Sequence, residues 1–244
     1  MLVRPARAQN VALACRALKA MGLRRLCLVG APAELSDRET RALAYGAWDV
    51  LDGASHCESL AEAVRSSVLV AGTSGRVFEG EVVSPRRLAE EGGGRSGGGR
   101  TSIVFGPEAT GLSREELASC HLTVHVPTHE DQPSLNLAQA VLVIAYELRL
   151  ASLSEPTLDR VPAGEPDAAR ATAGELEEAL ADFRGAALGI GYLNPQGPDR
   201  LLAEWRRLLA RAAPTRREVT LLRGLARQMA FAASAIARAP RGAG

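Results

Sequence analysis

The feature that most constrains the fold is an alternation of short apolar runs with helix-like patterns over the first 150 residues. The apolar runs lie at 2–3, 26–29, 67–70, 103–105 and 122–126. The helix-like patterns lie near 10–22, 37–46, 59–65, 84–91, 113–119 and 135–150. Strands that alternate with helices form parallel sheets, because a parallel connection needs a crossover. We therefore predict an α/β domain with a mostly parallel sheet over residues 1–151.

The rest of the chain has a different pattern. Residues 152–171 are rich in proline, alanine and acid and predict a linker. Three further helical patterns, at 175–188, 199–212 and 215–237, predict a small all-helical module over residues 172–244. Within the first domain, the glycine-rich segment 90–100 predicts a mobile surface loop.

Composition narrows the class of function. The net charge is +1, which excludes a protein that is basic throughout, and aromatic residues make up only 4%, which disfavours base reading by an aromatic sheet. Basic charge is nevertheless concentrated at one end, since residues 200–244 carry 10 basic and 2 acidic groups. Such a cluster is typical of phosphate binding and also of a solvated helix face.

The cysteines and the hydropathy pattern indicate whether to expect a metal site, a membrane span or secretion. The four cysteines form no CxxC pair, so the spacing of a zinc site is absent. No apolar stretch approaches the roughly 20 residues of a membrane span, and the first residues do not resemble a signal peptide. We expect a cytoplasmic protein without metal or membrane partners.

The first segment with signals beyond core packing is QNVALACRALKAMGL at 9–23. Asn10 is placed as the N-cap of a helix. Val11, Ala14 and Cys15 belong to its apolar stripe. At 100° per residue Arg16 falls about 140° from Val11, so we expect it to point away from the core.

The second segment is IVFGPEATGLSREEL at 103–117. A buried strand ends in a turn with Gly106 and Gly111, and a helix begins near Ser113 with Glu116 at the capping-box position. Glycines just past a parallel strand let the backbone approach a ligand closely. The segment has no GxGxxG, so a dinucleotide site lacks its fingerprint.

The third segment is VPTHEDQPSLNLAQAVLVIAYEL at 126–148. A loop bounded by Pro127 and Pro133 leads into Ser134, Leu135 and Asn136 at the start of a long helix. A helix N-terminus offers free N–H groups to an anion. Ser134 is equally explained as the helix cap.

In this order, the three segments resemble the SPOUT class of RNA methyltransferases, and more narrowly its TrmH/TrmJ-type 2′-O-ribose methyltransferases. The matching positions are Asn10 and Arg16, then Phe105, Gly106, Glu108, Gly111 and Leu112, then Ser134, Leu135, Asn136, Leu137, Tyr146 and Glu147. The loop Gly72–Arg76 also fits. Ala12 stands where this family usually has glycine, and the glycine-rich insertion at 90–100 has no counterpart in it.

The resemblance implies a trefoil-knotted sheet domain that binds S-adenosylmethionine through loop backbone, with no metal. The residues it assigns to the cofactor are Thr73, Ser74, Gly75, Gly106, Gly111, Val126, Ser134, Leu135 and Asn136. It implies Arg16 as the catalytic residue. Since arginine is permanently charged, we favour phosphate binding and stabilisation of an alkoxide over proton abstraction. Asn10 and Ser134 would position the ribose or Arg16, Glu108 would orient Arg16, and Asn136 would support the site.

The resemblance further implies a homodimer and an RNA substrate, most closely nucleotide 32 of the tRNA anticodon loop, with ribosomal RNA as the alternative. RNA contacts would come from Arg16 and, in the helical module, from Arg206, Arg207, Arg216 and Arg217. Base methylation is a competing activity, but Cys15 and Cys120 fit buried thiols better than a nucleophile. A non-catalytic RNA-binding protein that retains the knot is the hypothesis from another class.

Overall fold

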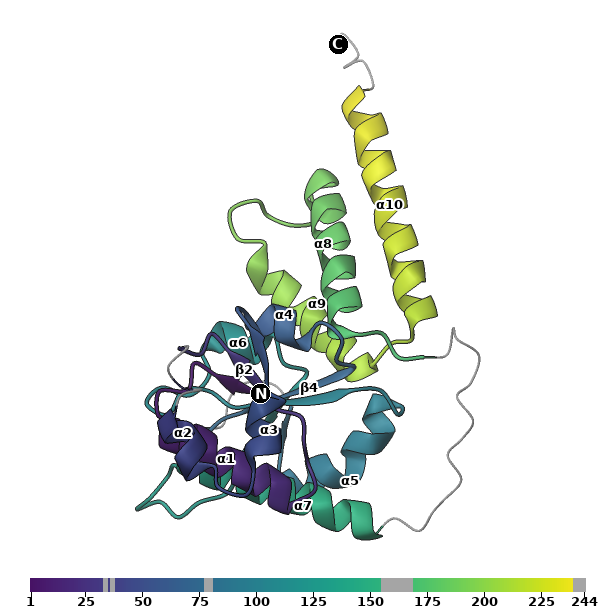
Figure 1. Ribbon diagram of the computed structural model, residues 1–244. Coiled ribbons are helices and arrows are strands. Elements are labelled where there is room, and N and C mark those ends of the chain that lie inside the picture. Colours follow the sequence, from purple (N-terminus) through teal and green to yellow (C-terminus); the bar gives the residue numbers. More distant parts are fainter. Residues whose placement is uncertain (33–34, 36–37, 77–80, 155–168, 239–244) are drawn as a thin grey trace. The chain divides into compact units, whose positions relative to one another are not determined.

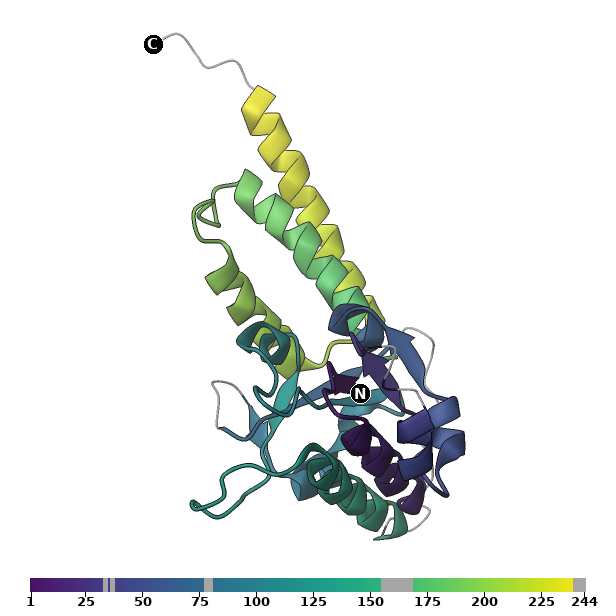
Figure 2. The same cartoon turned by 60° about the vertical axis from the view of Figure 1, so that its left-hand side comes forward.

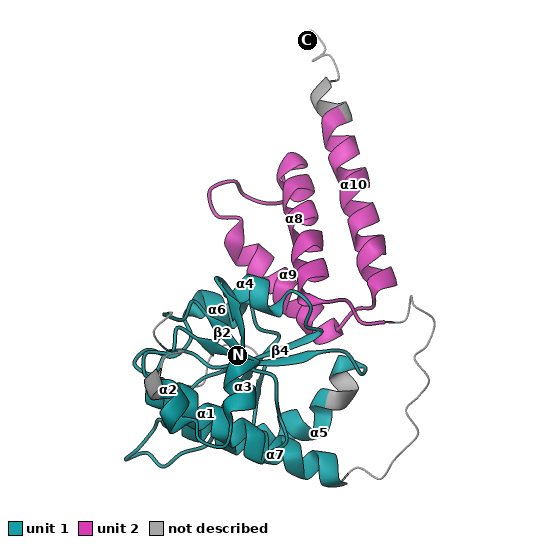
Figure 3. Cartoon of the chain, in the orientation of Figure 1, with its two compact units in different colours: residues 1–160 teal, residues 161–244 magenta. Residues whose placement is uncertain are grey.

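The computed structural model describes residues 1–32, 35, 38–76, 81–154 and 169–238. The chain forms two compact units, residues 1–160 and residues 161–244 (Figure 3). The sequence places its linker at 152–171, and 155–168 lie outside the described residues.

The first unit is built on a parallel sheet (Figure 1). Its strands are β1 (Leu2–Val3), β2 (Cys27–Val29), β3 (Ser55–Cys57), β4 (Leu69–Thr73), β5 (Val82–Val83), β6 (Thr101–Val104) and β7 (Leu122–Val124). They pair in the orders β1-β2-β3 and β5-β7-β4-β6, every pair being parallel. A parallel bridge between Leu2 and Phe105 joins the two sets, with the Val3 N–H donating to the Phe105 carbonyl oxygen at 2.8 Å. The predicted mostly parallel α/β class is confirmed.

Helices cover both faces of this sheet. They are α1 (Ala8–Ala20), α2 (Arg38–Leu43), α3 (Trp48–Asp52), α4 (Leu60–Val64), α5 (Pro85–Ser96), α6 (Arg114–Ala118) and α7 (Leu137–Ser154). Helices α1, α5 and α7 lie side by side on one face (Figures 1 and 2), where Val11, Cys15 and Ile144 join the main apolar core. On the other face α6 packs closely on β4, since a Cβ at Gly72 would lie 3.1 Å from Leu117 Cδ2 of α6.

The prediction of a mobile loop at 90–100 is wrong. Residues up to Ser96 continue α5, and Gly97 and Gly98 end the helix with φ of +55° and +79°. Each glycine in a helix interior costs about 1 kcal/mol relative to alanine. Packing outweighs that cost here, because α5 lies against α7 and buries Leu88 and Gly92.

The second unit contains α8 (Ala173–Gly189), α9 (Asp199–Ala212) and α10 (Arg216–Arg238), as the helical patterns predict. Helix α8 packs along α10 (Figures 1 and 2). Leu176, Leu180, Leu209 and Val219 form a core between the three helices. None of the described helices is both long and apolar enough to cross a membrane.

Candidate active site

Helix α1 carries the first two candidate residues. It begins at Ala8, and Arg7 occupies the cap position without a side-chain cap, so the predicted N-cap role of Asn10 is wrong. Asn10 lies inside the first turn and is only 4% exposed. A buried amide must satisfy its hydrogen bonds inside the protein, and its partners come from two distant segments.

The hydrogen-bond partners of Asn10 come from the second and third sequence segments, 103–117 and 126–148. The Asn10 Nδ2 group donates to Glu108 Oε1 at 2.7 Å, and Asn136 Nδ2 donates to Asn10 Oδ1 at 2.9 Å. The second Glu108 oxygen, Oε2, accepts from the Ala6 backbone N–H at 2.9 Å. A continuous chain of hydrogen bonds therefore runs from Glu108 through Asn10 to Asn136.

Glu108 is held ionised by this chain. Burial is the largest single influence and acts to raise the pKa of Glu108, but the hydrogen bonds from the Asn10 side chain and from the Ala6, Glu108 and Arg7 backbone together outweigh it and hold the pKa below its usual value. Both carboxylate oxygens are directed at Asn10 and Ala6. Glu108 thus orients Asn10, whereas the sequence analysis expected it to orient Arg16.

Arg16 is exposed, as the helical spacing predicts. Its side chain makes no hydrogen bond or ion pair with any residue that the structure describes. It borders a cleft of about 830 Å³. The lining of that cleft includes Asn10, Leu13, Arg16, Tyr45, Asn136 and Leu142. An unpaired guanidinium therefore stands beside the polar chain, free to bind an anion.

The start of α7 is capped by Asn136. Its Oδ1 accepts from the Ala138 N–H at 2.9 Å, and its own N–H donates to Gln139 Oε1 at 3.1 Å. The alternative that Ser134 caps this helix is wrong, and its exposed side chain is left for another role. The contribution of Gln139 was missed, although Asn-x-x-Gln before an apolar run is a capping-box signal.

The loops assigned to the cofactor meet at the carboxyl edge of the sheet. The Ser74 N–H donates to the Val124 carbonyl oxygen at 3.0 Å, and His125 Nδ1 lies 3.1 Å from the Ser74 carbonyl oxygen. A Cβ at Gly75 would lie 3.6 Å from the Pro133 carbonyl oxygen. The ends of β4 and β7 and the loop before α7 are thus neighbours.

The remaining assigned residues lie on the same loops. Thr73 is the last residue of β4, Val126 packs against the main core, and Leu135 is half-buried just before α7. Gly106 follows β6, and a Cβ there would lie 2.2 Å from the Leu112 backbone N atom. Only glycine fits such an approach.

The arginines of the helical module fall into two groups. Arg206 grips Glu177 with two hydrogen bonds of 2.6 and 2.8 Å, and Arg216 pairs with Glu175 at 3.1 Å. Arg217 is exposed and forms no ion pair with the described residues, while Arg207 is exposed on α9. Within the described residues no group of three or more metal-binding side chains occurs.

Comparisons with known proteins identify the family to which each part of the chain is similar. Residues 1–146 match the family described as the SpoU rRNA Methylase family, and residues 175–240 match the C-terminal domain of tRNA methyltransferase TrmJ. A tRNA (cytidine/uridine-2′-O-)-methyltransferase TrmJ of Cronobacter sakazakii is 35% identical over 226 residues, covering 92% of each chain.

Two solved structures are also similar. The crystal structure of TrmJ from Z. mobilis superposes with a TM-score of 0.77 at 29% identity, covering 93% of this chain and 96% of the other. The SpoU methyltransferase AviRb of Streptomyces viridochromogenes, solved with AdoMet, shares the fold with a TM-score of 0.50 at 22% identity. That match covers 63% of this chain and 60% of the other.

Proposed function

The chain belongs to the SpoU rRNA methylase family, and we propose that it transfers the methyl group of S-adenosylmethionine to the 2′-hydroxyl of a ribose in tRNA. The observation that carries the proposal is the Glu108–Asn10–Asn136 chain beside Arg16, which has no partner among the described residues. The names of relatives that align over nearly the whole chain support tRNA as substrate.

S-adenosylmethionine supplies an electrophilic methyl group when bound. The protein then has to hold the ribose in line and to stabilise charge on its O2′ atom. Arg16 binds the phosphate next to the target ribose and stabilises the O2′ atom as its proton leaves to water. Asn10 and Asn136 fix the floor of the site, and the Ser134 hydroxyl orients the ribose.

The residues present fit the cofactor. A sulfonium ligand with many hydrogen-bonding groups suits a cradle of loop backbone, and the loops after β4, β6 and β7 provide one. The close approach at Gly106 leaves no room for a side chain, so backbone lines this part of the edge. The proposed contacts are Thr73, Ser74, Gly75, Gly106, Gly111, Val126, Ser134, Leu135 and Asn136.

We propose nucleotide 32 of the anticodon loop as the methylated position. The decisive experiment incubates the protein with radiolabelled S-adenosylmethionine and either unmodified tRNA or ribosomal RNA, followed by mapping of the 2′-O-methyl sites. Label in tRNA at position 32 supports the proposal. Label in ribosomal RNA alone, or in a base, overturns it, and no transfer at all favours a non-catalytic RNA-binding protein.

We also propose a homodimer in which Arg16 acts across the interface. Large apolar side chains of the cleft lining are exposed, with Leu13 37%, Tyr45 73% and Leu142 42% accessible, and Tyr146, four residues after Leu142 on α7, is 49% accessible. A second copy would bury this surface. Mixing the Arg16→Ala variant with a Gly106→Ala variant should restore activity in mixed dimers. Inactivity after verified subunit exchange would exclude shared sites.

Two further parts of the proposal concern threading and compartment. Strand β7 lies between β4 and β5, inside the sheet, which supports threading of the last strand into a trefoil knot. The four cysteines are unpaired thiols, which supports a reducing, cytoplasmic location. Resistance of the folded core to pulling from both ends would test the knot.

The helical module is proposed to bind the body of the tRNA. Since Arg206 and Arg216 pair with acids of α8, the exposed Arg217 is the stronger candidate for phosphate contact, and Arg207 is proposed beside it on its exposure alone. Each neutralised phosphate steepens the salt dependence of binding. A tRNA affinity that does not change with salt would contradict this role.

A further inference from the structure

We propose that Arg4 is a positioning residue of the methyl-transfer site. By gripping Glu116, its guanidinium holds the connection between β1 and α1 against the segment 106–116, so that Glu108 meets Asn10. The inference rests on the proposed function. It concerns a residue that the sequence analysis assigned no role and that lines neither the cleft nor the cofactor loops.

The first observation is a strained backbone. Arg4 has a φ of +43°, a strained conformation that side-chain-bearing residues rarely adopt. Such a conformation persists only where its surroundings hold it. The Arg4 N–H donates to the Val29 carbonyl oxygen at 2.7 Å, which fixes the backbone side of the residue.

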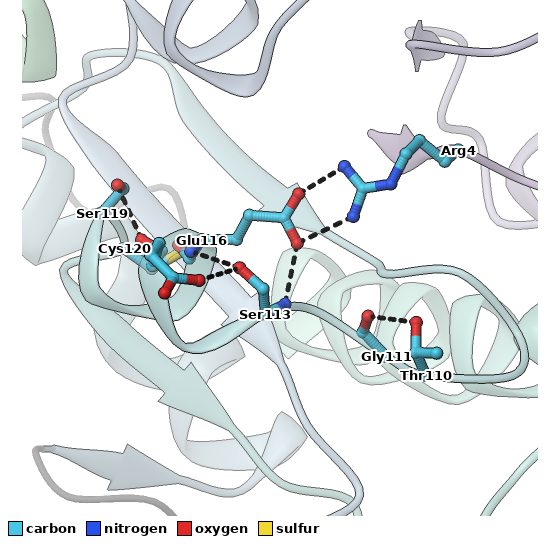
Figure 4. A network of polar contacts seen from close by, with 8 residues as sticks. Arg4, Thr110, Gly111, Ser113, Glu116, Ser119 and Cys120 are labelled. Carbon is cyan, nitrogen blue, oxygen red and sulfur yellow. Dashed lines mark hydrogen bonds and ion pairs between the residues drawn. The ribbon is translucent and has the colours of Figure 1, made fainter.

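The second observation is a bidentate ion pair. Arg4 Nη1 and Nη2 donate to Glu116 Oε1 and Oε2 at 2.6 and 3.1 Å (Figure 4). The Glu116 side chain is 15% exposed and the Arg4 side chain 52%, so solvent screens the pair mainly from the arginine side. The hydrogen bond from Arg4 outweighs burial and holds the pKa of Glu116 below its usual value. The paired carboxylate is therefore ionised at neutral pH.

The third observation is where Glu116 is attached. Its Oε2 atom also accepts from the Ser113 N–H at 2.8 Å, closing the capping box of α6 (Figure 4). Helix α6 follows the loop in which Gly106 packs against the backbone of Gly111 and Leu112. An interaction that fixes the position of Glu116 therefore also fixes the loop that carries Glu108.

The fourth observation is the spacing of the contacts. Along the connection, the Arg4 side chain binds Glu116 and the Ala6 N–H binds Glu108 at 2.9 Å. Glu116 and Glu108, both in the segment 106–116, therefore bind positions 4 and 6 of the connection between β1 and α1. Without the first contact, the hydrogen bond from the Arg4 N–H to Val29 remains, but the side-chain interaction that also holds the left-handed conformation of Arg4 is lost. The Ala6 N–H and Asn10 would then shift relative to Glu108.

The test compares Arg4→Gln with a matched control, Arg86→Gln. Arg86 also makes two contacts with a carboxylate, Glu147, which is 18% exposed, but the pair joins α5 to α7 and does not line the cleft. We expect Arg4→Gln to lower kcat by roughly tenfold, since small displacements at a reacting centre are costly, with little change in either KM. Arg86→Gln should stay within about twofold of wild type. Arg4→Lys keeps the charge but loses the fork, so partial recovery is expected.

Two readouts separate positioning from stability. In the double variant with Asn10→Ala, the Arg4→Gln substitution should cause no further loss of kcat in single turnovers, because both act through one contact. The Asn10 side-chain amide resonance in NMR should move toward that of a solvated amide in Arg4→Gln and not in Arg86→Gln. This second readout needs no activity, so it distinguishes failure of the proposed function from failure of the Arg4 proposal. An unmoved resonance, or fully additive losses of kcat, overturns the role of Arg4.

Discussion

Replacing Asn10 by aspartate should convert the centre of the site from a hydrogen bond into a repulsion. The Asn10 Nδ2 donor lies 2.7 Å from Glu108 Oε1, and in the variant a carboxylate oxygen takes its place. Two carboxylates so close do not both ionise, so the pair retains a proton and its folded pKa rises. The contact to Asn136 survives, because the acceptor oxygen of residue 10 is kept.

The expected loss of unfolding free energy has a lower and an upper bound. Loss of a hydrogen bond to a charged group costs about 1.5–3 kcal/mol. Holding one proton at pH 7 on a group with an unfolded pKa of about 3.9 costs at most about 4 kcal/mol. We therefore expect the Asn10→Asp variant to lose about 2–4 kcal/mol of unfolding free energy at pH 7.

The pH dependence gives this prediction its signature. A raised folded pKa contributes stability that is lost as pH rises, so the variant should recover up to about 2.7 kcal/mol between pH 7 and pH 5. Wild type should change little there, because Glu108 has a lowered pKa and is ionised throughout. Urea unfolding at pH 5, 6 and 7 measures the unfolding free energy of the variant and of wild type. Asn194→Asp, in an exposed turn, is the control and should cost less than about 0.5 kcal/mol. A variant as stable as wild type, with no pH dependence, would refute the contact.

Three further outcomes follow from the structure. Gly106→Ala should abolish binding of S-adenosylmethionine in equilibrium dialysis, because its Cβ would lie 2.2 Å from backbone, whereas Gly185→Ala, with nothing within 4 Å, should be silent. Arg206→Gln should lower the unfolding free energy of the helical module by about 1 kcal/mol, while Arg217→Gln should leave stability unchanged and reduce the salt slope of tRNA binding by about 1; equal effects on stability would contradict this division. Wild type should lose stability below about pH 4.5, as Glu108 becomes protonated through its lowered folded pKa, and a Glu108→Gln variant should lose less over that window in acid titrations followed by circular dichroism.

Elements with a strong local pattern were predictable from the sequence. Strands such as β2 and β4 are apolar runs, and the capping box of α6 is written in residues 113–116. Strand β3, with the sequence Ser-His-Cys, carries no apolar run and is recognised only through its pairing with β2. Helix α5 contains three glycines, and its packing against α7 overrides their propensity.

In the candidate site too, some features follow from the local sequence and others only from distant contacts. The outward direction of Arg16 follows from helical spacing alone. Asn10 satisfied a local rule for a helix cap, but its partner Glu108 lies 98 positions away and no local rule contains that contact. The cap of α7 was misassigned by two residues, because Ser134 and Asn136 are both good cap residues and only the geometry of the loop decides between them.

The central place of β1 has a consequence for how the molecule assembles during synthesis. β1 is the first strand to be made, yet its second neighbour arrives only with Phe105, after some hundred more residues. Until then, the β1-β2-β3 half and the later half are separate pieces, each with its own edge. The contacts of Ala6 and Asn10 with Glu108 cross the seam between them. The residues of the candidate site come from both parts of the sheet. Methyl-transfer activity therefore requires that the two parts have paired, so activity in a newly made or partly unfolded chain reports that pairing.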